Sequence, residues 1–209
     1  MISYFGNFKE VTKLTSPLPI TAAQVRAKAR YFEDNRGDTS KDSEIEDDIL
    51  QGVLNWERET GFLIFDQTFK VFLYNERYIT TNFTASIPVL NVYSFDSIKY
   101  YPCDWNYQDP KTTLDQTLYY FTPEAGLSPS QFKPAKELQV FSVYNNIELN
   151  AKGGYQDNNF ASMQLNIKRA LILMVADAFD VKQGYCAMNT AEVRAIYEQY
   201  KPNLISVTV

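Results

Sequence analysis

Chemistry in this sequence would have to come mainly from carboxylates, because the 209 residues include no histidine. Histidine is the commonest general base and metal ligand, so its absence excludes Ser-His and Cys-His triads. Cys103 and Cys186 lie far apart and form no CxxC pair, which makes a structural zinc site improbable. No P-loop or dinucleotide fingerprint is present, and no helix opens directly after Gly153-Gly154. The sequence therefore predicts neither a metal site nor a cofactor.

Acidic and aromatic residues do occur together in two long polar stretches, 103–117 and 122–136, and beside them. Glycosidases use such a mixture, but the spacing here selects no catalytic pair. A carboxylate-dependent hydrolase and a sugar-binding patch remain alternatives, while solvated loops and an interface cluster fit the pattern better. We therefore predict that the chain is not an enzyme. The acids are Asp104, Asp109, Asp115 and Glu124, and the aromatics are Trp105, Tyr107, Tyr119 and Tyr120.

Charge is unevenly distributed along the chain. The net charge is -5, but residues 31–60 hold ten acidic and three basic residues, so that this segment carries −7 and the remainder +2. One interpretation is the solvated face of a helix. The other is a surface that lets DNA pass without binding it, since neutralised phosphates are what create tight binding.

Four helices are expected. Thr21 and Gln24 form a capping box before a helix at about 22–32. A stripe with helical period predicts a second helix at 44–60, stopped by Gly61. The most apolar helix, about 162–183, should centre the core, and a second capping box at Asn189 and Glu192 should open the last, 190–200. The residues of the stripe are Ile45, Ile49, Val53 and Trp56.

After Gly61 the hydrophobic period changes to two, which is typical of strands. The pattern predicts an α+β fold, in which a bundle of about four helices carries an inserted antiparallel β-subdomain. The helical core should comprise 20–61 and 160–200, the β-subdomain 62–155, and extended arms 1–19 and 201–209. The expected strands are 68–73, 87–92, 97–101, 118–121, 138–144 and 147–151, with a turn at 94–96.

The order of several short runs resembles the head-tail connector family of tailed bacteriophages, the adaptors that attach beneath the portal. The resemblance covers about residues 20–180 and rests on order and spacing. The runs are Ile20-Thr21-Ala22-Ala23-Gln24-Val25, Glu46-Asp47-Asp48-Ile49-Leu50, Glu59-Thr60-Gly61, Gln67-Thr68-Phe69, Ile87-Pro88-Val89-Leu90-Asn91-Val92, Ser97-Ile98-Lys99-Tyr100-Tyr101, Ala151-Lys152-Gly153-Gly154-Tyr155 and Ile167-Lys168-Arg169-Ala170-Leu171-Ile172-Leu173-Met174-Val175-Ala176. The stretches 103–136, 1–19 and 201–209 depart from the family and inherit nothing from it.

The resemblance implies a structural protein of the virion neck, assembled in the host cytoplasm. It implies a closed ring, typically of twelve copies, that contacts the portal and the next tail protein and continues the channel through which genomic DNA passes. No signal peptide or membrane span is expected. A carbohydrate-binding or tail-associated β-rich module is the alternative.

Partner contacts are expected at the two arms and in the aromatic loops, because free β-prone ends can add a strand to a neighbour and Trp and Tyr are frequent interface anchors. The expected interface residues are Tyr4, Phe5, Trp105, Tyr107, Leu204, Ile205, Val207 and Val209.

Overall fold

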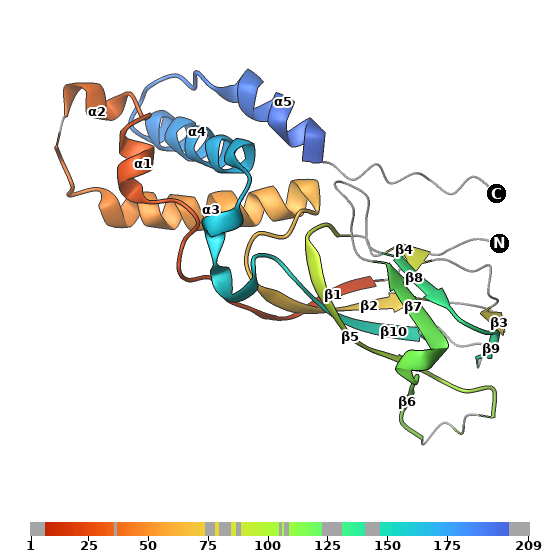
Figure 1. Ribbon diagram of the computed structural model, residues 1–209. Helices are drawn as coiled ribbons and strands as arrows, with labels where there is room; N and C mark the ends of the chain where they lie inside the picture. The colour runs from red at the N-terminus through yellow and green to blue at the C-terminus, as the bar shows by residue number, and fades with distance from the viewer. Residues whose placement is uncertain are drawn as a thin grey trace. The chain divides into compact units, whose positions relative to one another are not determined.

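The computed structural model describes residues 7–35, 37–73, 78–79, 85–86, 89–104, 106, 109–122, 131–140 and 147–200. The chain divides into two compact units, each made of separate segments. A helical unit comprises 15–64 and 157–201, and a β unit comprises 1–14, 65–156 and 202–209. The expected α+β class is thus confirmed (Figure 1).

The helical unit is built around two long helices, α3 (Asp42–Thr60) and α4 (Leu165–Lys182), which pack against each other. Helix α5 (Thr190–Tyr200) contacts both of them, as does α1 (Ala22–Arg26). The stripe predicted for α3 is fully buried at all four positions, and helix α3 ends at Gly61 in the left-handed conformation. Helices α3, α4 and α5 therefore lie nearly where the sequence predicted the last three helices. The difference is at the start of α4, where residues 160–162 form a 3₁₀ turn.

The expected helix at 22–32 is wrong in its length. The capping box of Thr21 and Gln24 is present, but α1 ends at Arg26 and a separate turn, α2 (Tyr31–Asp34), follows. The cause is distant in sequence: the carboxylate of Asp180 accepts hydrogen bonds from the backbone N–H groups of Arg30 (2.8 Å) and Tyr31 (3.0 Å). A continuous helix would have used those donors for its own carbonyls.

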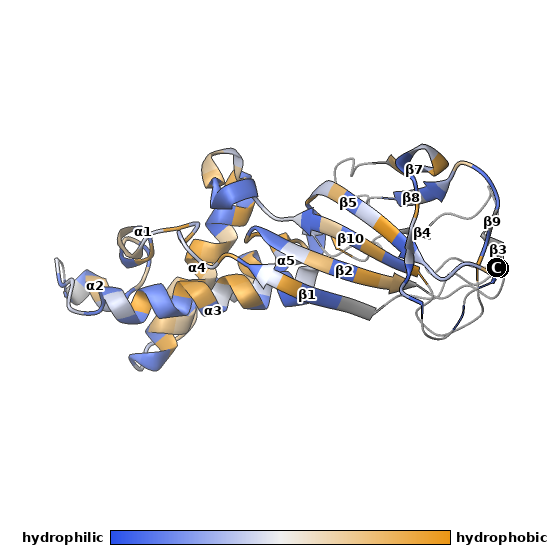
Figure 2. Cartoon of the chain, turned by 90° about the horizontal axis from the view of Figure 1, so that it is seen from below, coloured by the Kyte–Doolittle hydropathy of each residue, from blue (hydrophilic) through white to orange (hydrophobic). Residues whose placement is uncertain are grey.

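The β unit contains a five-stranded antiparallel sheet of strand order β1-β2-β10-β5-β6. Its members are β1 (Asn7–Lys13), β2 (Gln67–Leu73), β5 (Val92–Tyr100), β6 (Thr112–Thr113) and β10 (Ile147–Gly153). Phe69, Val71, Leu149 and Ile98 are buried and share one face through the register, while the alternate residues of the strands lie on a polar face. The alternation of hydropathy along these strands is visible in Figure 2.

Strand β1 falls within the stretch that was expected to be an N-terminal arm. Residues 7–13 pair with β2 of the same chain, so that this part of 1–19 completes the chain's own sheet. Residues 1–6 lie outside the described residues.

Strand β5 contains most of the expected strand at 97–101 and extends back through the expected turn. The expected strand at 87–92 fails where it is described, because Asn91 has a positive φ of 65° and β5 begins only at Val92. The strand then runs through the predicted turn at 94–96. Two register shifts against β10 accommodate Tyr93 and Asp96 as extra residues, which is how a β-bulge keeps an irregular stretch inside a sheet.

The remaining strands are short; some coincide with the strands expected at 118–121 and 138–144, and others lie in stretches expected to be loops. The second sheet has order β4-β8-β7, formed by β4 (Ala85–Ser86), β7 (Tyr119–Thr122) and β8 (Gln131–Pro134). A third pairs β3 (Tyr78–Ile79) with β9 (Leu138–Gln139), which is shorter than the strand expected at 138–144; residues 141–146 are not described. Strands β6 and β8 lie within 103–117 and 122–136, so those stretches are partly ordered by the sheets.

Candidate interaction surfaces

The buried carboxylates of the helical unit are engaged by backbone amides. Besides Asp180, Asp177 of α4 accepts from the backbone N–H groups of Met188 (3.0 Å) and Asn189 (2.8 Å) and from the side-chain amide of Asn189 (2.8 Å). Asp177 thus holds the segment before α5, where the sequence suggested a capping box of Asn189 with Glu192. Glu57 of α3 accepts from the backbone N–H of Ile64 at 2.7 Å. These acids stabilise turns and helix starts.

One of the acids considered for catalysis has a structural role in the β unit. Asp115 caps a 3₁₀ turn by accepting from the backbone and hydroxyl of Thr117, and these hydrogen bonds lower its pKa, the opposite of what a general acid needs. Glu124 lies outside the described residues. In the described parts of the chain, no three His, Cys, Asp or Glu side chains gather in a way that could hold a metal ion. Both cysteines are exposed thiols.

The aromatic residues near these acids divide into packed and exposed ones. The ring of Tyr119 lies edge-on to Phe95, whose ring stacks on Phe121 at 5.0 Å. Burial, and secondarily the charge of Asp115, raises the pKa of the Tyr119 phenol. Tyr120 is 64% exposed. Tyr119 therefore serves packing in the β unit, while Tyr120 is available to a partner.

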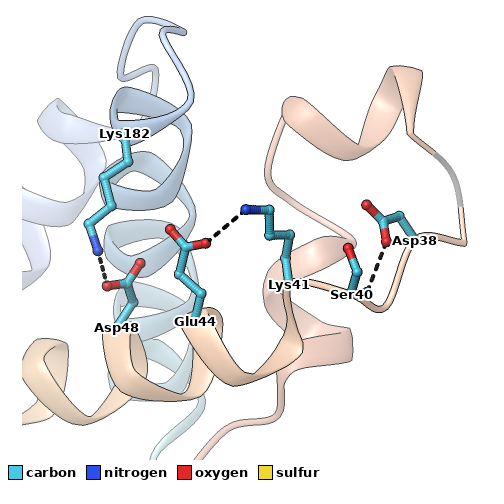
Figure 3. Close-up of polar contacts among 6 residues, drawn as sticks. All are labelled: Asp38, Ser40, Lys41, Glu44, Asp48 and Lys182. Carbon is cyan, nitrogen blue, oxygen red and sulfur yellow. Dashed lines mark hydrogen bonds and ion pairs between the residues drawn. The ribbon is translucent and has the colours of Figure 1, made fainter.

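The acidic segment 31–60 is partly neutralised within the helical unit. Figure 3 shows Lys182 of α4 paired with Asp48 and Lys41 paired with Glu44 at 3.3 Å. Asp42 pairs with Arg26. The N-terminal half of α3 has two further acids, Glu46 and Asp47. Both are exposed, and neither has an ion-pair partner among the described residues.

A second polar feature of that segment lies before α3. The backbone N–H of Ser40 donates to Asp38 at 2.8 Å (Figure 3). Hydrogen bonds from the side chain and backbone of Ser40 lower the pKa of Asp38. Asp38 therefore remains ionised and shapes the turn that leads into α3.

The polar face of the five-stranded sheet carries a cluster of lysines around one acid. Glu148 of β10 pairs with Lys70 of β2 at 2.8 Å and with Lys111 at 3.5 Å. The Lys111 ammonium also lies 5.2 Å from the ring centroid of Phe72 and 5.1 Å from that of Tyr101. A carboxylate and two rings thus hold a lysine that is mostly buried against the sheet.

The pKa shifts in this cluster follow from burial and mutual charge. Burial lowers the pKa of Lys111; Glu148 opposes that shift, and the positive charges of Lys70 and Lys99 add to it. Burial alone would raise the pKa of Glu148, but hydrogen bonds and charge from Lys70 and Lys111 lower it overall. The sheet face therefore keeps a stable carboxylate among several ammonium groups.

None of the interface residues expected from the sequence can be placed. Tyr4, Phe5, Trp105, Tyr107, Leu204, Ile205, Val207 and Val209 all lie outside the described residues. Sequence analysis missed the lysine cluster, although the alternation of Lys70 and Glu148 with buried residues in their strands was a signal of a polar sheet face.

Across the described residues, no helix combines the length and the apolar character that a membrane crossing requires.

A scan against protein-family models found no matching family, and a search of curated proteins found no match either. Solved structures do match over nearly the whole chain. A chain of the virion of a native gene transfer agent (GTA) particle has a TM-score of 0.68 at 12% identity, covering 97% of this chain and 96% of its own. A chain from the neck of an empty GTA particle, computed with C6 symmetry, has a TM-score of 0.68 at 13% identity. A chain from the neck of a native GTA particle, computed with C12 symmetry, has a TM-score of 0.63 at 14% identity. Both matches cover 97% of this chain and 97% of the matched chain. The chain therefore shares its fold with proteins of GTA virions and necks.

Proposed function

We propose that this chain is a structural protein of the neck of a phage-like particle, in which identical copies form a ring. The observation that carries the proposal is the match to GTA neck chains over 97% of this sequence, helical and β units together. A match of both units is more informative than one shared subdomain, because the two units are interleaved along the chain.

The side-chain chemistry supports a structural role. The buried acids Asp177, Asp180 and Glu57 hold backbone amides, and Asp115 caps a turn. Catalytic acids are usually kept in clefts with pKa values matched to proton transfer. These four acids instead maintain the fold, which fits a protein with a structural role.

The ring is supported by the symmetry of the neck structures that the chain resembles, C6 and C12. A ring of twelve identical copies satisfies both, since sixfold symmetry is contained in twelvefold. Such a ring needs a heterologous contact, in which two different patches of the same chain meet.

The finer role we propose is that of a head-tail adaptor, which contacts the portal on one side and the next tail protein on the other while DNA passes through the ring. The arms and aromatic loops would provide the contacts, through Tyr4, Phe5, Trp105, Tyr107, Leu204, Ile205, Val207 and Val209. Exposed Tyr120 extends that set to a described position.

The test is to locate the chain in assembled particles. Particles that carry an epitope tag on this protein would be purified and their necks reconstructed by cryo-electron microscopy without imposed symmetry. We expect density for this fold in a ring at the neck. Density in the capsid shell or the distal tail, or absence from particles, would refute the proposal.

A second measurement addresses the docking role. Removal of residues 203–209 should leave a folded subunit, judged by circular dichroism, that no longer attaches to tail-less heads. Attachment at the level of the full chain would exclude the C-terminal arm as the contact.

A further inference from the structure

The polar face of the five-stranded sheet carries more lysines than acids, although the whole protein has a net charge of -5. We call it the lysine face and define it by residues of β1, β2, β5 and β10 together with Lys111, which packs on this side. Through the register, Lys9 lies opposite Lys70, and Lys99 lies opposite Glu148. The acids of this face are Glu148 and Asp96, the latter 3.9 Å from Lys152. Its lysines are Lys9, Lys70, Lys99, Lys111 and Lys152.

Two of these lysines carry a charge that no described acid pairs with. Lys9 is exposed and Lys99 is half-buried, and neither has an ion-pair partner within the described part of the chain. The other three lysines, Lys70, Lys111 and Lys152, form ion pairs with acids of the same face. Lys9 on β1 and Lys99 on β5 lie on either side of the Lys70–Glu148 pair, and their positive charges remain open to a partner. Rigid strands fix this pattern before any partner arrives, which lowers the entropy cost of binding.

The same chain carries a complementary patch on α3. Glu46 and Asp47 are exposed on adjacent positions of a rigid helix, next to acids that are already paired with Arg26, Lys41 and Lys182. Like the two lysines, these two acids take part in none of the ion pairs formed between described residues. An ion pair with another molecule would cost neither patch an existing contact.

We propose that the lysine face of one copy binds Glu46 and Asp47 on α3 of the next copy. This inference rests on the proposed ring and names the contact that joins its neighbours. Because the two patches differ, each copy offers one to the preceding subunit and one to the following subunit, which is the arrangement of a closed ring. Opposite charges also fix the order of the contact and speed the encounter.

DNA is a poorer occupant of the lysine face. Five lysines against two acids leave a modest surplus, whereas tight DNA binding relies on many phosphate contacts. The face also includes rings, those of Phe72 and Tyr101, that pack against Lys111. Partly buried aromatic groups beside a few charges are characteristic of a protein interface.

The experiment uses two charge-reversed full chains and a matched control. The first carries Lys9→Glu with Lys99→Glu, and the second carries Glu46→Lys with Asp47→Lys. The control carries Lys28→Glu with Lys168→Glu, which changes the net charge as the first variant does but lies in the helical unit. Self-association is measured by sedimentation velocity over a concentration series at low and high salt, after circular dichroism has verified folding.

We expect each reversed variant alone to associate about tenfold more weakly than the wild type or worse, while the control associates normally. An equimolar mixture of the two variants should recover association. At one contact the acidic face of the first variant meets the basic helix of the second, and at the next contact the unchanged lysine face of the second variant meets the unchanged acidic helix of the first. Alternation allows only even-numbered rings, which negative-stain images can count. A chain carrying all four reversals should also recover association by itself.

Normal association of either reversed variant would overturn the inference, as would a mixture that stays dissociated or a wild type without measurable self-association. Fluorescence anisotropy with a DNA duplex adds a further arm. If the first variant loses DNA binding while its self-association is unchanged, the lysine face serves DNA and the inference is wrong. Localisation of the chain in particles decides the proposed function separately, so that a neck ring with unaffected reversed variants would refute only this contact.

Discussion

Asp180 and Tyr31, 149 residues apart in the sequence, are joined by a hydrogen bond of 3.0 Å from the Tyr31 backbone N–H to the buried carboxylate. The second oxygen of Asp180 accepts from the N–H of Arg30. One side chain of α4 thus determines where the N-terminal helical segment breaks and resumes as α2.

Substitution of Asp180 by Asn should therefore destabilise the helical unit by about 3 kcal/mol. The Asn side chain keeps one oxygen that can accept a hydrogen bond, but its NH₂ group then faces the second backbone N–H, which loses its acceptor. In addition, buried hydrogen bonds to a charged group stabilise a fold more than hydrogen bonds between neutral groups. Urea unfolding monitored by circular dichroism measures the change. Glu33→Gln, at an exposed position of α2, is the control and should be nearly neutral; equal stability of the two variants would contradict the role given to Asp180.

Gly52 marks a close approach of α3 and α4. A Cβ at this position would lie 2.9 Å from a methyl group of Val175 and 3.1 Å from the Met174 terminal carbon. Alanine is favoured over glycine within a helix by about 1 kcal/mol, but the overpacking costs about 1–3 kcal/mol. We expect Gly52→Ala to lower the free energy of unfolding by about 1 kcal/mol, measured by thermal or urea unfolding.

The control for Gly52 is Asn55→Ala, at an exposed position of the same helix. It should leave stability unchanged or raise it slightly through helix propensity. A stabilising effect of Gly52→Ala would show that the two helices separate easily there.

Gly154 in the β unit has a φ of 97°, and a Cβ there would lie 1.9 Å from the carbonyl oxygen of Phe65. The clashing atoms belong to the backbone, which cannot move aside as a flexible side chain can. Gly154→Ala should therefore lower the free energy of unfolding by more than about 4 kcal/mol and prevent stable folding of the sheet. Soluble yield and hydrogen exchange of β2 and β10 amides measure this outcome.

Gly184→Ala measures the cost of a left-handed backbone without the steric clash that is present at Gly154. Gly184 has a similar φ of 88°, but a Cβ there would meet nothing within 4 Å. Its substitution should cost only about 1–2 kcal/mol, the price of the left-handed backbone. Similar losses for the two variants would rule out the contact with Phe65 as the cause.

Glu148 predicts a pH dependence of the β unit. Its folded-state pKa lies below the ordinary value of 4.5, so the stability that it contributes is present above that value and is lost as the pH falls through the folded-state pKa. Glu148→Gln should therefore be less stable than wild type by about 1–2 kcal/mol at neutral pH. The two should converge in unfolding measurements below the folded-state pKa.

The control for Glu148 is Glu192→Gln. Glu192 pairs with Arg169 at 2.6 Å, but both side chains are largely exposed, and exposed pairs contribute little. Its effect should be small across the same pH range. A pH-independent loss in Glu148→Gln would indicate lost packing in place of lost charge.

Periodic patterns predicted the long elements of this fold because burial and period coincide in them. The stripe of α3 and the alternation at Phe69 and Val71 each report one buried face, and both were confirmed. The first helix was predicted too long because its interruption depends on Asp180, which no local pattern reveals. Likewise, the bulges in β5 exist only against β10, so the local turn signal at 94–96 was misleading.

The lysine face illustrates the same limit for function. Lys70 and Glu148 are 78 residues apart and meet only because β2 and β10 are neighbours in the sheet. Residue types alone were enough to predict that the chain is not an enzyme, but a charged surface assembled from four strands and Lys111 required the register.

The interleaving of the two units has a consequence for protein synthesis. Helix α3 ends at Thr60, yet its packing partner α4 begins only at Leu165, and β2 must wait for β10, which inserts between β2 and β5. At about 5–20 residues per second, translation from the end of α3 to the start of α4 takes roughly 5–20 s, during most of which neither core is complete. A nascent chain cut short before α4 leaves the apolar stripe of α3 uncovered and invites degradation. The sheet is therefore completed only when β10 has been made, and the helical core only when the C-terminal quarter of the chain has been made.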